Sequence, residues 1–249
     1  MSSTKPEEPS PNYEDYPIGK VSFSSGSEFV TIGYNTFETN EFIQAIGKYR
    51  FSREPYQHHR YDAVPLGLCA FGLTQFVTQM YNAQADGIKK PNALTAAATM
   101  YGGGVQFLTG LYMFLHKDPL YATVLTSYGA YWMALAANYI DGFGIRSSYP
   151  SEEMFNEAKG LWLLAWAIFT FMIVLATIKS SWPVLSSFIT LLISFVLEAS
   201  GELTNKRGVI RAAGVVGIVC AFLLWYIALG RIMTRNNSYI LGKLKPAFL

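Results

Sequence analysis

The sequence predicts an all-α membrane protein that crosses the bilayer with six helices. Charged residues make up 14% of the 249 residues, whereas soluble chains carry about 25%. Hydrophobic residues make up 51%, and the mean hydropathy is +0.22. Six windows of 18 to 25 residues contain no Asp, Glu, Lys or Arg. These windows are residues 63–85, 91–115, 119–140, 160–178, 180–197 and 212–230.

The length of the windows indicates membrane-spanning helices. About 20 mainly apolar residues carry an α-helix across a bilayer, and the windows do not alternate as the strands of a membrane barrel do. The alternative is a soluble protein with six buried helices. It is disfavoured because helices in soluble proteins usually keep charge on one side. We therefore expect a transmembrane domain over residues 61–235 whose helices contact membrane lipid.

Two polar tails are expected around this domain. In residues 1–27, four Pro residues lie among Ser, Glu and Gly, a composition typical of disorder. Residues 29–33 predict a short extended stretch. A short helix is expected from Thr39, an N-cap residue type, to Gly47, a typical helix stop. Residues 1–60 and 236–249 are thus predicted to be tails, the first largely disordered.

The distribution of Lys and Arg favours a cytoplasmic location for both tails. With the N-terminus inside, ten of these residues flank the spans on the cytoplasmic side and seven on the outer side. This is the bias of the positive-inside rule. The segment Met1–Glu14 is polar and rich in Pro, so it does not resemble a secretory signal. The first span is expected to direct insertion.

The first span carries a polar stripe at helical spacing. Polar side chains at membrane depth face protein or a water-filled cavity. The stripe therefore predicts either hydrogen bonds between helices or a polar path through the protein. It consists of Phe71, Gln75, Gln79 and Asn82, with Thr74 and Thr78 beside it. Residues of other spans that would complete such a path are Gln106, Thr126, Ser127, Tyr128 and Asn138.

Small residues in the second and sixth spans predict close helix packing, which is the main association device of helices in lipid. A phosphate-binding role for the Gly run is disfavoured, because a Gly-rich phosphate loop follows a strand. The small residues are Gly102, Gly103, Gly104 and Gly110 in the second span and Ala213, Gly217 and Ala221 in the sixth.

The charge pattern limits the solute that such a path would suit. No charged residue lies in mid-span. The path therefore suits a small neutral or weakly charged solute better than a metal cation, whose sites need carboxylates. Glu198 and Glu202 lie near the end of the fifth span, and we expect Lys206 or Arg211 to balance them.

Other residue types argue against several function classes. Cys69 and Cys220 each lie within a span and predict neither a disulfide nor a metal site. The three His residues lack zinc-ligand spacing, and no P-loop motif of an ATP-driven pump occurs. No nucleophile–base constellation appears, so no enzyme and no cofactor are predicted. A net charge of +2 indicates no nucleic-acid partner.

Several motifs, in order along the chain, resemble one family. The segment Asp62-Ala63-Val64-Pro65-Leu66-Gly67-Leu68 is similar to the Asn-Pro-Ala-Pro-Leu-Gly-Leu signature of the acetate uptake transporter family. This family includes bacterial succinate–acetate permeases and fungal acetate and ammonia-export proteins. Further similar segments are 100–106, 125–132, 166–170, 177–180 and 237–239. The resemblance covers about residues 29–246, and the long N-terminal extension points to the fungal branch.

The resemblance implies a function and an assembly. It implies channel-like transport of small monocarboxylates such as acetate through each subunit of a ring-like homo-hexamer in the plasma membrane. It places a hydrophobic constriction at Phe71, Tyr128 and Leu191. Apolar and aromatic constrictions can gate by dewetting. Gln75, Gln79 and Gln106 would then supply hydrogen bonds to the solute.

Three departures from the family pattern leave alternatives open. Asp62 and Ala63 replace the Asn-Pro of the signature, and Met113 replaces a Glu late in the second span. A carboxylate at the entrance would repel acetate unless it is protonated or paired with Arg60 or His59. The alternatives are therefore ammonia or ammonium export, or a membrane regulator that transports nothing.

Overall fold

The computed structural model describes residues 21–23, 28–32, 35–52, 62–84, 92–233, 237 and 239. The chain divides into two compact units, residues 1–60 and 61–249. Each unit is described by itself.

The first unit contains a small sheet and a helix. Strands β1 (Val21–Phe23), β2 (Phe29–Ile32) and β3 (Asn35–Glu38) form an antiparallel sheet in the order β1-β2-β3. Helix α1 (Thr39–Ser52) follows, and the rings of Phe37 and Phe42 stack with centroids 5.9 Å apart.

Two details of this unit differ from the prediction. Strand β1 lies in the stretch that was expected to be disordered, while residues 1–20 lie outside the described residues. Helix α1 begins at Thr39 but continues past Gly47, because one Gly in a helix costs only about 1 kcal/mol. The Thr39 hydroxyl has no hydrogen-bond partner among the described residues, and its backbone N–H donates to the Glu28 carbonyl at 2.8 Å.

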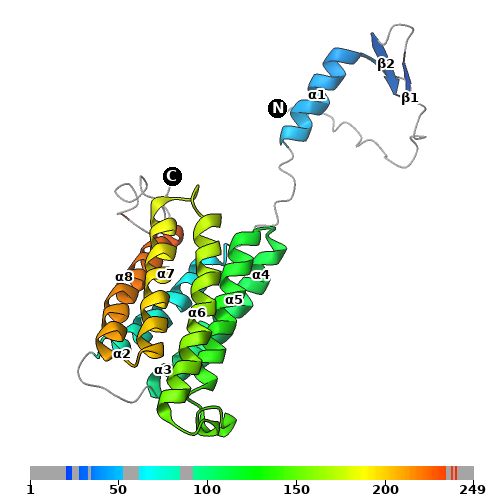
Figure 1. Ribbon diagram of the computed structural model, residues 1–249. Helices are drawn as coiled ribbons and strands as arrows, with labels where there is room; N and C mark the ends of the chain where they lie inside the picture. Colours follow the sequence, from blue (N-terminus) through cyan, green and yellow to red (C-terminus); the bar gives the residue numbers. More distant parts are fainter. Residues whose placement is uncertain are drawn as a thin grey trace, which may run out of the picture. The chain divides into compact units, whose positions relative to one another are not determined.

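The second unit is a bundle of helical rods (Figure 1). Helices α3, η3 and α4 follow one another without a break and form a single rod, whose π-helical middle contains Gly102, Gly103 and Gly104. The elements are α2 (Val64–Asn82), α3 (Asn92–Ala97), η3 (Ala98–Val105), α4 (Gln106–Leu115), α5 (Pro119–Ala137), α6 (Glu152–Ala176), α7 (Trp182–Leu203) and α8 (Arg207–Ile232).

Local sequence explains where several helices begin. Pro65, Pro119 and Pro183 occupy first-turn positions of α2, α5 and α7, where a missing N–H costs nothing. The Asp118 carboxylate accepts a hydrogen bond from the Tyr121 N–H at 3.1 Å, and the Ser151 hydroxyl accepts one from the Met154 N–H at 3.2 Å. These caps satisfy N–H groups that the helix leaves unpaired.

Three helices extend beyond their charge-free windows. Helix α6 begins at Glu152 rather than near residue 160, α7 runs to Leu203, and α8 begins at Arg207. The stretch 141–159 between the third and fourth windows is therefore only partly a loop, and it holds two short turns, Asp141–Phe143 and Arg146–Ser148, before α6 begins. Charge ends an apolar window, but it does not end the backbone hydrogen bonding of a helix.

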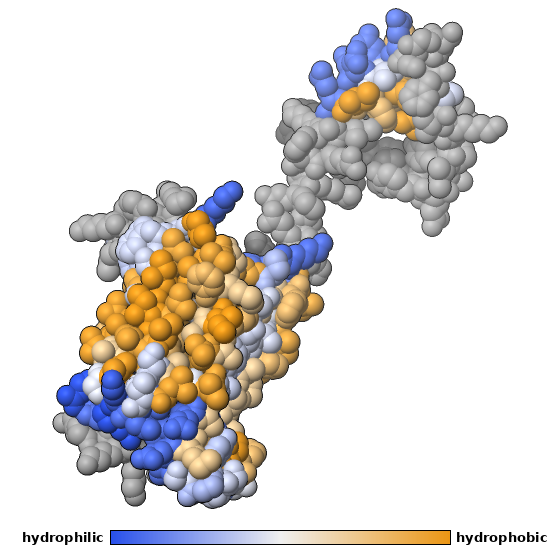
Figure 2. All heavy atoms as spheres, in the orientation of Figure 1, coloured by the Kyte–Doolittle hydropathy of each residue, from blue (hydrophilic) through white to orange (hydrophobic). Residues whose placement is uncertain are grey.

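The surface of the bundle has an apolar face. Among the described residues, α6, α7 and α8 are long and apolar enough to cross a membrane. Figure 2 shows an apolar face over α6 and α7, with hydrophilic residues gathered at the end where α6 begins and α7 ends. Large exposed side chains on α6 include Leu161, Ile168 and Phe171. A face of this kind is stable only against lipid or another protein surface.

The starts of α2 and α5 meet the end of α8. Arg231, in the last turn of α8, forms an ion pair with Asp62 (Nη1 to Oδ2, 2.8 Å) and donates a hydrogen bond to the Tyr121 hydroxyl at 3.4 Å. Helices α2 and α5 therefore run in the same direction, and α8 runs opposite to both. Residues at equal distances from the starts of α2 and α5 consequently lie at similar heights along the bundle.

Several predicted packing residues lie where helices touch. A Cβ at Gly110 would overlap the backbone N and the hydroxyl of Thr126, and one at Gly103 would lie 2.6 Å from Met133 Cγ. A Cβ at Gly217 would overlap Gln79. Gly104 differs, since its Cβ would lie 3.5 Å from the Thr99 carbonyl, an ordinary contact. Ala213 and Ala221 are fully buried.

This difference predicts unequal effects of two Gly substitutions. We expect Gly110→Ala to lower the free energy of unfolding by about 1–3 kcal/mol, because the added methyl group must push α4 away from α5. Gly104→Ala is the matched control and should leave stability nearly unchanged. Thermal unfolding in detergent, followed by the fluorescence of the five Trp residues, measures both. Equal melting temperatures for the two variants would contradict the packing described above.

Candidate functional site

Two aromatic rings from different helices meet in the core of the bundle. Phe71 on α2 and Tyr128 on α5 are 1% and 0% exposed, and their ring centroids lie 5.0 Å apart. Trp132, one turn after Tyr128, lies with its ring centroid 5.9 Å from that of Phe71. Leu191 on α7 belongs to the same buried cluster. The structure thus brings Phe71 and Tyr128 into direct contact.

The Tyr128 hydroxyl is held by a neighbouring helix. It shares a hydrogen bond of 2.7 Å with the Thr170 hydroxyl on α6, which in turn donates to the Trp166 carbonyl at 2.7 Å. This bond fixes the ring plane against Phe71. Sequence reasoning did not predict Trp132 or Thr170 for this site, although Trp132 lies four residues after Tyr128 and thus on the same face of α5.

Several buried polar atoms of α2, α4 and α5 have no hydrogen-bond partner among the described residues. Polar groups buried in proteins are nearly always hydrogen-bonded to protein or to ordered water. The unpaired atoms therefore mark positions where water or a polar solute supplies the missing bond. Within these three helices the unpaired atoms are Thr74 Oγ1, Gln75 Nε2, Gln106 Nε2 and Oε1, Thr126 Oγ1 and Trp132 Nε1. Ser127 and Asn138 are partly buried.

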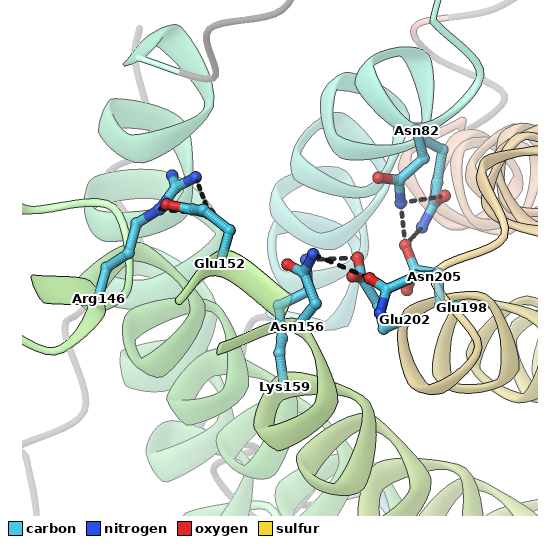
Figure 3. Close-up of polar contacts among 9 residues, drawn as sticks. Asn82, Arg146, Glu152, Asn156, Lys159, Glu198, Glu202 and Asn205 are labelled. Atoms are coloured by element: carbon cyan, nitrogen blue, oxygen red, sulfur yellow. Dashed lines mark hydrogen bonds and ion pairs between the residues drawn. The ribbon is translucent and has the colours of Figure 1, made fainter. Parts of the chain in front are cut away.

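The polar stripe of α2 continues to a buried carboxyl group on α7 (Figure 3). Gln79 donates to Glu198 Oε1 at 3.4 Å, Asn82 also donates to Glu198 Oε1, and Asn82 Nδ2 lies 3.1 Å from Gln79 Oε1. Glu198 is 6% exposed. The three side chains link α2 to α7 at the end of the bundle where α6 begins.

The prediction that Lys206 or Arg211 balances Glu198 and Glu202 is wrong. Glu202 instead pairs with Lys159 on α6 (Oε1 to Nζ, 2.7 Å), and both side chains are largely buried. Arg211 donates to Gln84. Lys159 lies in the extension of α6 beyond its apolar window, so the windows did not place it on a helix.

A polar cavity of about 600 Å³ opens beside this cluster. Its lining includes Asn82, and it carries more positive than negative side chains, a distribution that attracts anions. The hydrogen bond from Arg146 to Glu152 (Nε to Oε1, 2.9 Å) raises the pKa of the Arg146 guanidinium, which therefore stays charged. The charged lining residues are Arg146, Lys159, Arg207, Arg211, Glu152 and Glu202. We call this cavity the vestibule.

At the other end of the bundle, Asp62 has partners that sequence reasoning missed. Its Oδ1 accepts a hydrogen bond from the Val64 N–H at 3.0 Å, and its Oδ2 forms the ion pair with Arg231. Arg60 and His59, the predicted partners, lie outside the described residues. Met113, which stands where the family has Glu, is buried in the apolar core.

A helical bundle with an apolar outer face and a buried file of polar side chains is the architecture of an integral membrane transport protein. Residues 46–246 match the GPR1/FUN34/yaaH family, and the chain belongs to this family.

Known relatives agree with this assignment. The chain is 39% identical to Accumulation of dyads protein 2 of Saccharomyces cerevisiae over 92% of this chain and 82% of that protein. It is 37% identical to Ammonia transport outward protein 2 of the same yeast, over 86% of this chain and 77% of the relative. The solved structure of the bacterial acetate channel SatP superposes with a TM-score of 0.64 at 25% identity, and the match covers 71% of this chain and 94% of that one.

Proposed function

We propose that this protein carries small monocarboxylates such as acetate across the membrane through a channel-like path inside each subunit. The observation that carries the proposal is the contact of Phe71 with Tyr128 at the head of the buried polar stripe of α2. Kinship with a bacterial acetate channel supports acetate as a substrate.

The geometry suggests how a carboxylate would move. The excess positive charge of the vestibule concentrates the anion. Amide groups of Gln79, Gln75 and Gln106 then replace its water, because polar groups in a narrow path take over hydration. The constriction of Phe71, Tyr128 and Leu191 excludes hydrated ions, and the Tyr128 hydroxyl offers one hydrogen bond to the passing solute.

We further propose the arrangement in the membrane. The rods α2, α3–η3–α4, α5, α6, α7 and α8 form six spans, with both tails in the cytoplasm and the plasma membrane as location. The ion pair of Asp62 with Arg231 supports this topology, because it joins the start of the first rod to the end of the last. Exposed Leu108, Leu111 and Phe114 on α4 supply an apolar face for lipid or for the neighbouring subunits of a ring-like homo-hexamer.

Uptake of labelled acetate into liposomes that contain the purified protein tests the proposed function. Protein-free liposomes of the same lipid are the control, because acetic acid itself crosses lipid. We expect the protein to raise uptake above this background. Uptake equal to the background would refute monocarboxylate transport.

Ammonium export is the second candidate. The carboxylate of Glu198 and the side-chain carbonyl groups of Gln79 and Asn82 supply hydrogen-bond acceptors that suit an N–H donor, and one relative is an ammonia transport outward protein. Labelled methylammonium, offered to the same liposomes, distinguishes the two solutes. Uptake of methylammonium without uptake of acetate would favour export of ammonia or ammonium.

The departures at Asp62 and Ala63 raise the third candidate, a regulator without transport. We expect Asp62→Asn to change acetate flux by less than about fivefold, because a half-exposed ion pair contributes at most about 1 kcal/mol. The double variant Asp62→Asn, Ala63→Pro rebuilds the family signature. Should this variant transport acetate while the native protein does not, the regulator is the better assignment.

A further inference from the structure

Glu198 has a buried carboxyl group that is hydrogen-bonded to a lining residue of the vestibule, and its role below rests on the proposed transport of carboxylates. Asn82 lines the vestibule and donates a hydrogen bond to Glu198. Gln79, one turn earlier on α2, also donates to Glu198 and lies on the side of Gln75 and Phe71. A path that follows the polar stripe of α2 from the vestibule to the constriction therefore leads past Glu198.

Lys159 is the cation nearest to two buried carboxyl groups, those of Glu198 and Glu202, but it pairs with one of them. Lys159 binds Glu202 at 2.7 Å, whereas Glu198 makes no ion pair within the part of the chain that the structure describes. Titratable and polar groups face Glu198 from each helix that packs against it. They are Lys159 on α6, Glu202 on α7, Tyr131 on α5, and Gln79 and Asn82 on α2, with Arg211 of α8 on the vestibule wall.

A buried carboxyl group that has amide donors but no cation of its own can exist in either protonation state. Its charged form is costly without an ion-pair partner, while two amide N–H groups lower that cost. The constriction beyond it presents aromatic rings and offers a carboxylate no cation among the described side chains that form it. A neutral acid crosses such a place far more easily than an anion does.

We propose that Glu198 hands a proton to the substrate, so that a carboxylate that enters the vestibule crosses the constriction as the neutral acid. The O–H bond of the Glu198 carboxyl group breaks, and a new O–H bond forms on a carboxylate oxygen of the substrate. Glu198 is left as a carboxylate, which accepts the hydrogen bonds of Asn82 and Gln79. Water of the vestibule then returns a proton to Glu198 and is left as hydroxide, which the buffer of that compartment neutralises, so one proton crosses with each substrate anion.

The test compares native protein with Glu198→Gln in liposomes at two pH values, with protein-free liposomes as background. Near pH 7.5 a small carboxylic acid in solution is almost fully ionised, so we expect Glu198→Gln to lower acetate flux about tenfold or more, as loss of a positioned acid does. Near pH 5.5 the solution itself supplies neutral acid, and the two fluxes should agree within about twofold.

Matched variants separate this role from a structural one. Glu157→Gln removes an exposed carboxylate of α6 and should transport as the native protein does at both pH values. Glu198→Asp keeps the carboxyl group and should retain more flux than Glu198→Gln near neutral pH. The Asp variant also provides a test of the proposal if the Gln variant folds poorly. An equal loss of flux at both pH values, or no loss in a folded Glu198→Gln variant, overturns the proton handover. No flux in the native protein refutes the proposed function itself.

Discussion

Replacement of Tyr128 by Ala is expected to abolish discrimination between acetate and longer monocarboxylates. The ring fills the space between Phe71 and Thr170, and its removal leaves a cavity in the narrowest part of the proposed path. An apolar pocket discriminates one methylene group by about 1–3 kcal/mol. We therefore expect the ratio of acetate to butyrate flux to fall about tenfold or more. The loss of the buried ring should also cost about 3–5 kcal/mol of stability.

Two controls make this prediction specific. Tyr128→Phe keeps the ring and removes only the hydroxyl that bonds to Thr170, so it should keep the size preference of the native protein. Leu161→Ala removes a large side chain from the exposed face of α6 and should change neither flux. If Tyr128→Ala preserves the acetate to butyrate ratio, the constriction does not lie at this ring.

Replacement of Lys159 by Met is expected to destabilise the bundle strongly. Lys159 is the cation of the buried pair with Glu202, and Glu198 lies one helical turn before Glu202 on α7. Removing one partner of a buried ion pair leaves a charge without compensation and costs about 3–5 kcal/mol. The melting temperature in detergent, read from Trp fluorescence, should fall accordingly.

The double variant Lys159→Met, Glu202→Gln tests the reason for this loss. It removes both charges of the pair, so most of the stability lost in the single variant should return. Lys179→Met is the matched control, since Lys179 is exposed beyond the end of α6, and its melting temperature should stay near that of the native protein. A double variant as unstable as the single one would show that packing of the Lys159 stem, rather than its charge, holds α6 to α7.

The helical character of the second unit could be predicted because it depends on local sequence. Each window overlaps one helical rod, and Pro65, Pro119 and Pro183 mark helix starts by their fixed backbone angle. The ends of the rods could not be predicted from charge. Glu152 and Lys159 lie inside α6 although they fall outside its apolar window. Both side chains line the vestibule, a polar environment that hydropathy does not predict.

Part of the candidate site also followed from sequence. The spacing of Gln75, Gln79 and Asn82 placed them on one face of α2 by helical periodicity alone. The contact of that face with Tyr128 rested on resemblance to a family, since periodicity does not say which helix packs against which. In the structure Phe71 and Tyr128 touch.

The sequence by itself determined whether each segment lies in an apolar or an aqueous environment. The rods have apolar windows, the stretches between them are polar, and the first rod carries a polar stripe. What only the tertiary structure decided is the pairing of charges and rings from distant parts of the chain. Asp62 meets Arg231, Lys159 meets Glu202, and Asn82 meets Glu198. Hydrophobic patterning is a property of neighbouring residues, whereas an ion pair or a buried hydrogen bond depends on which helices pack together.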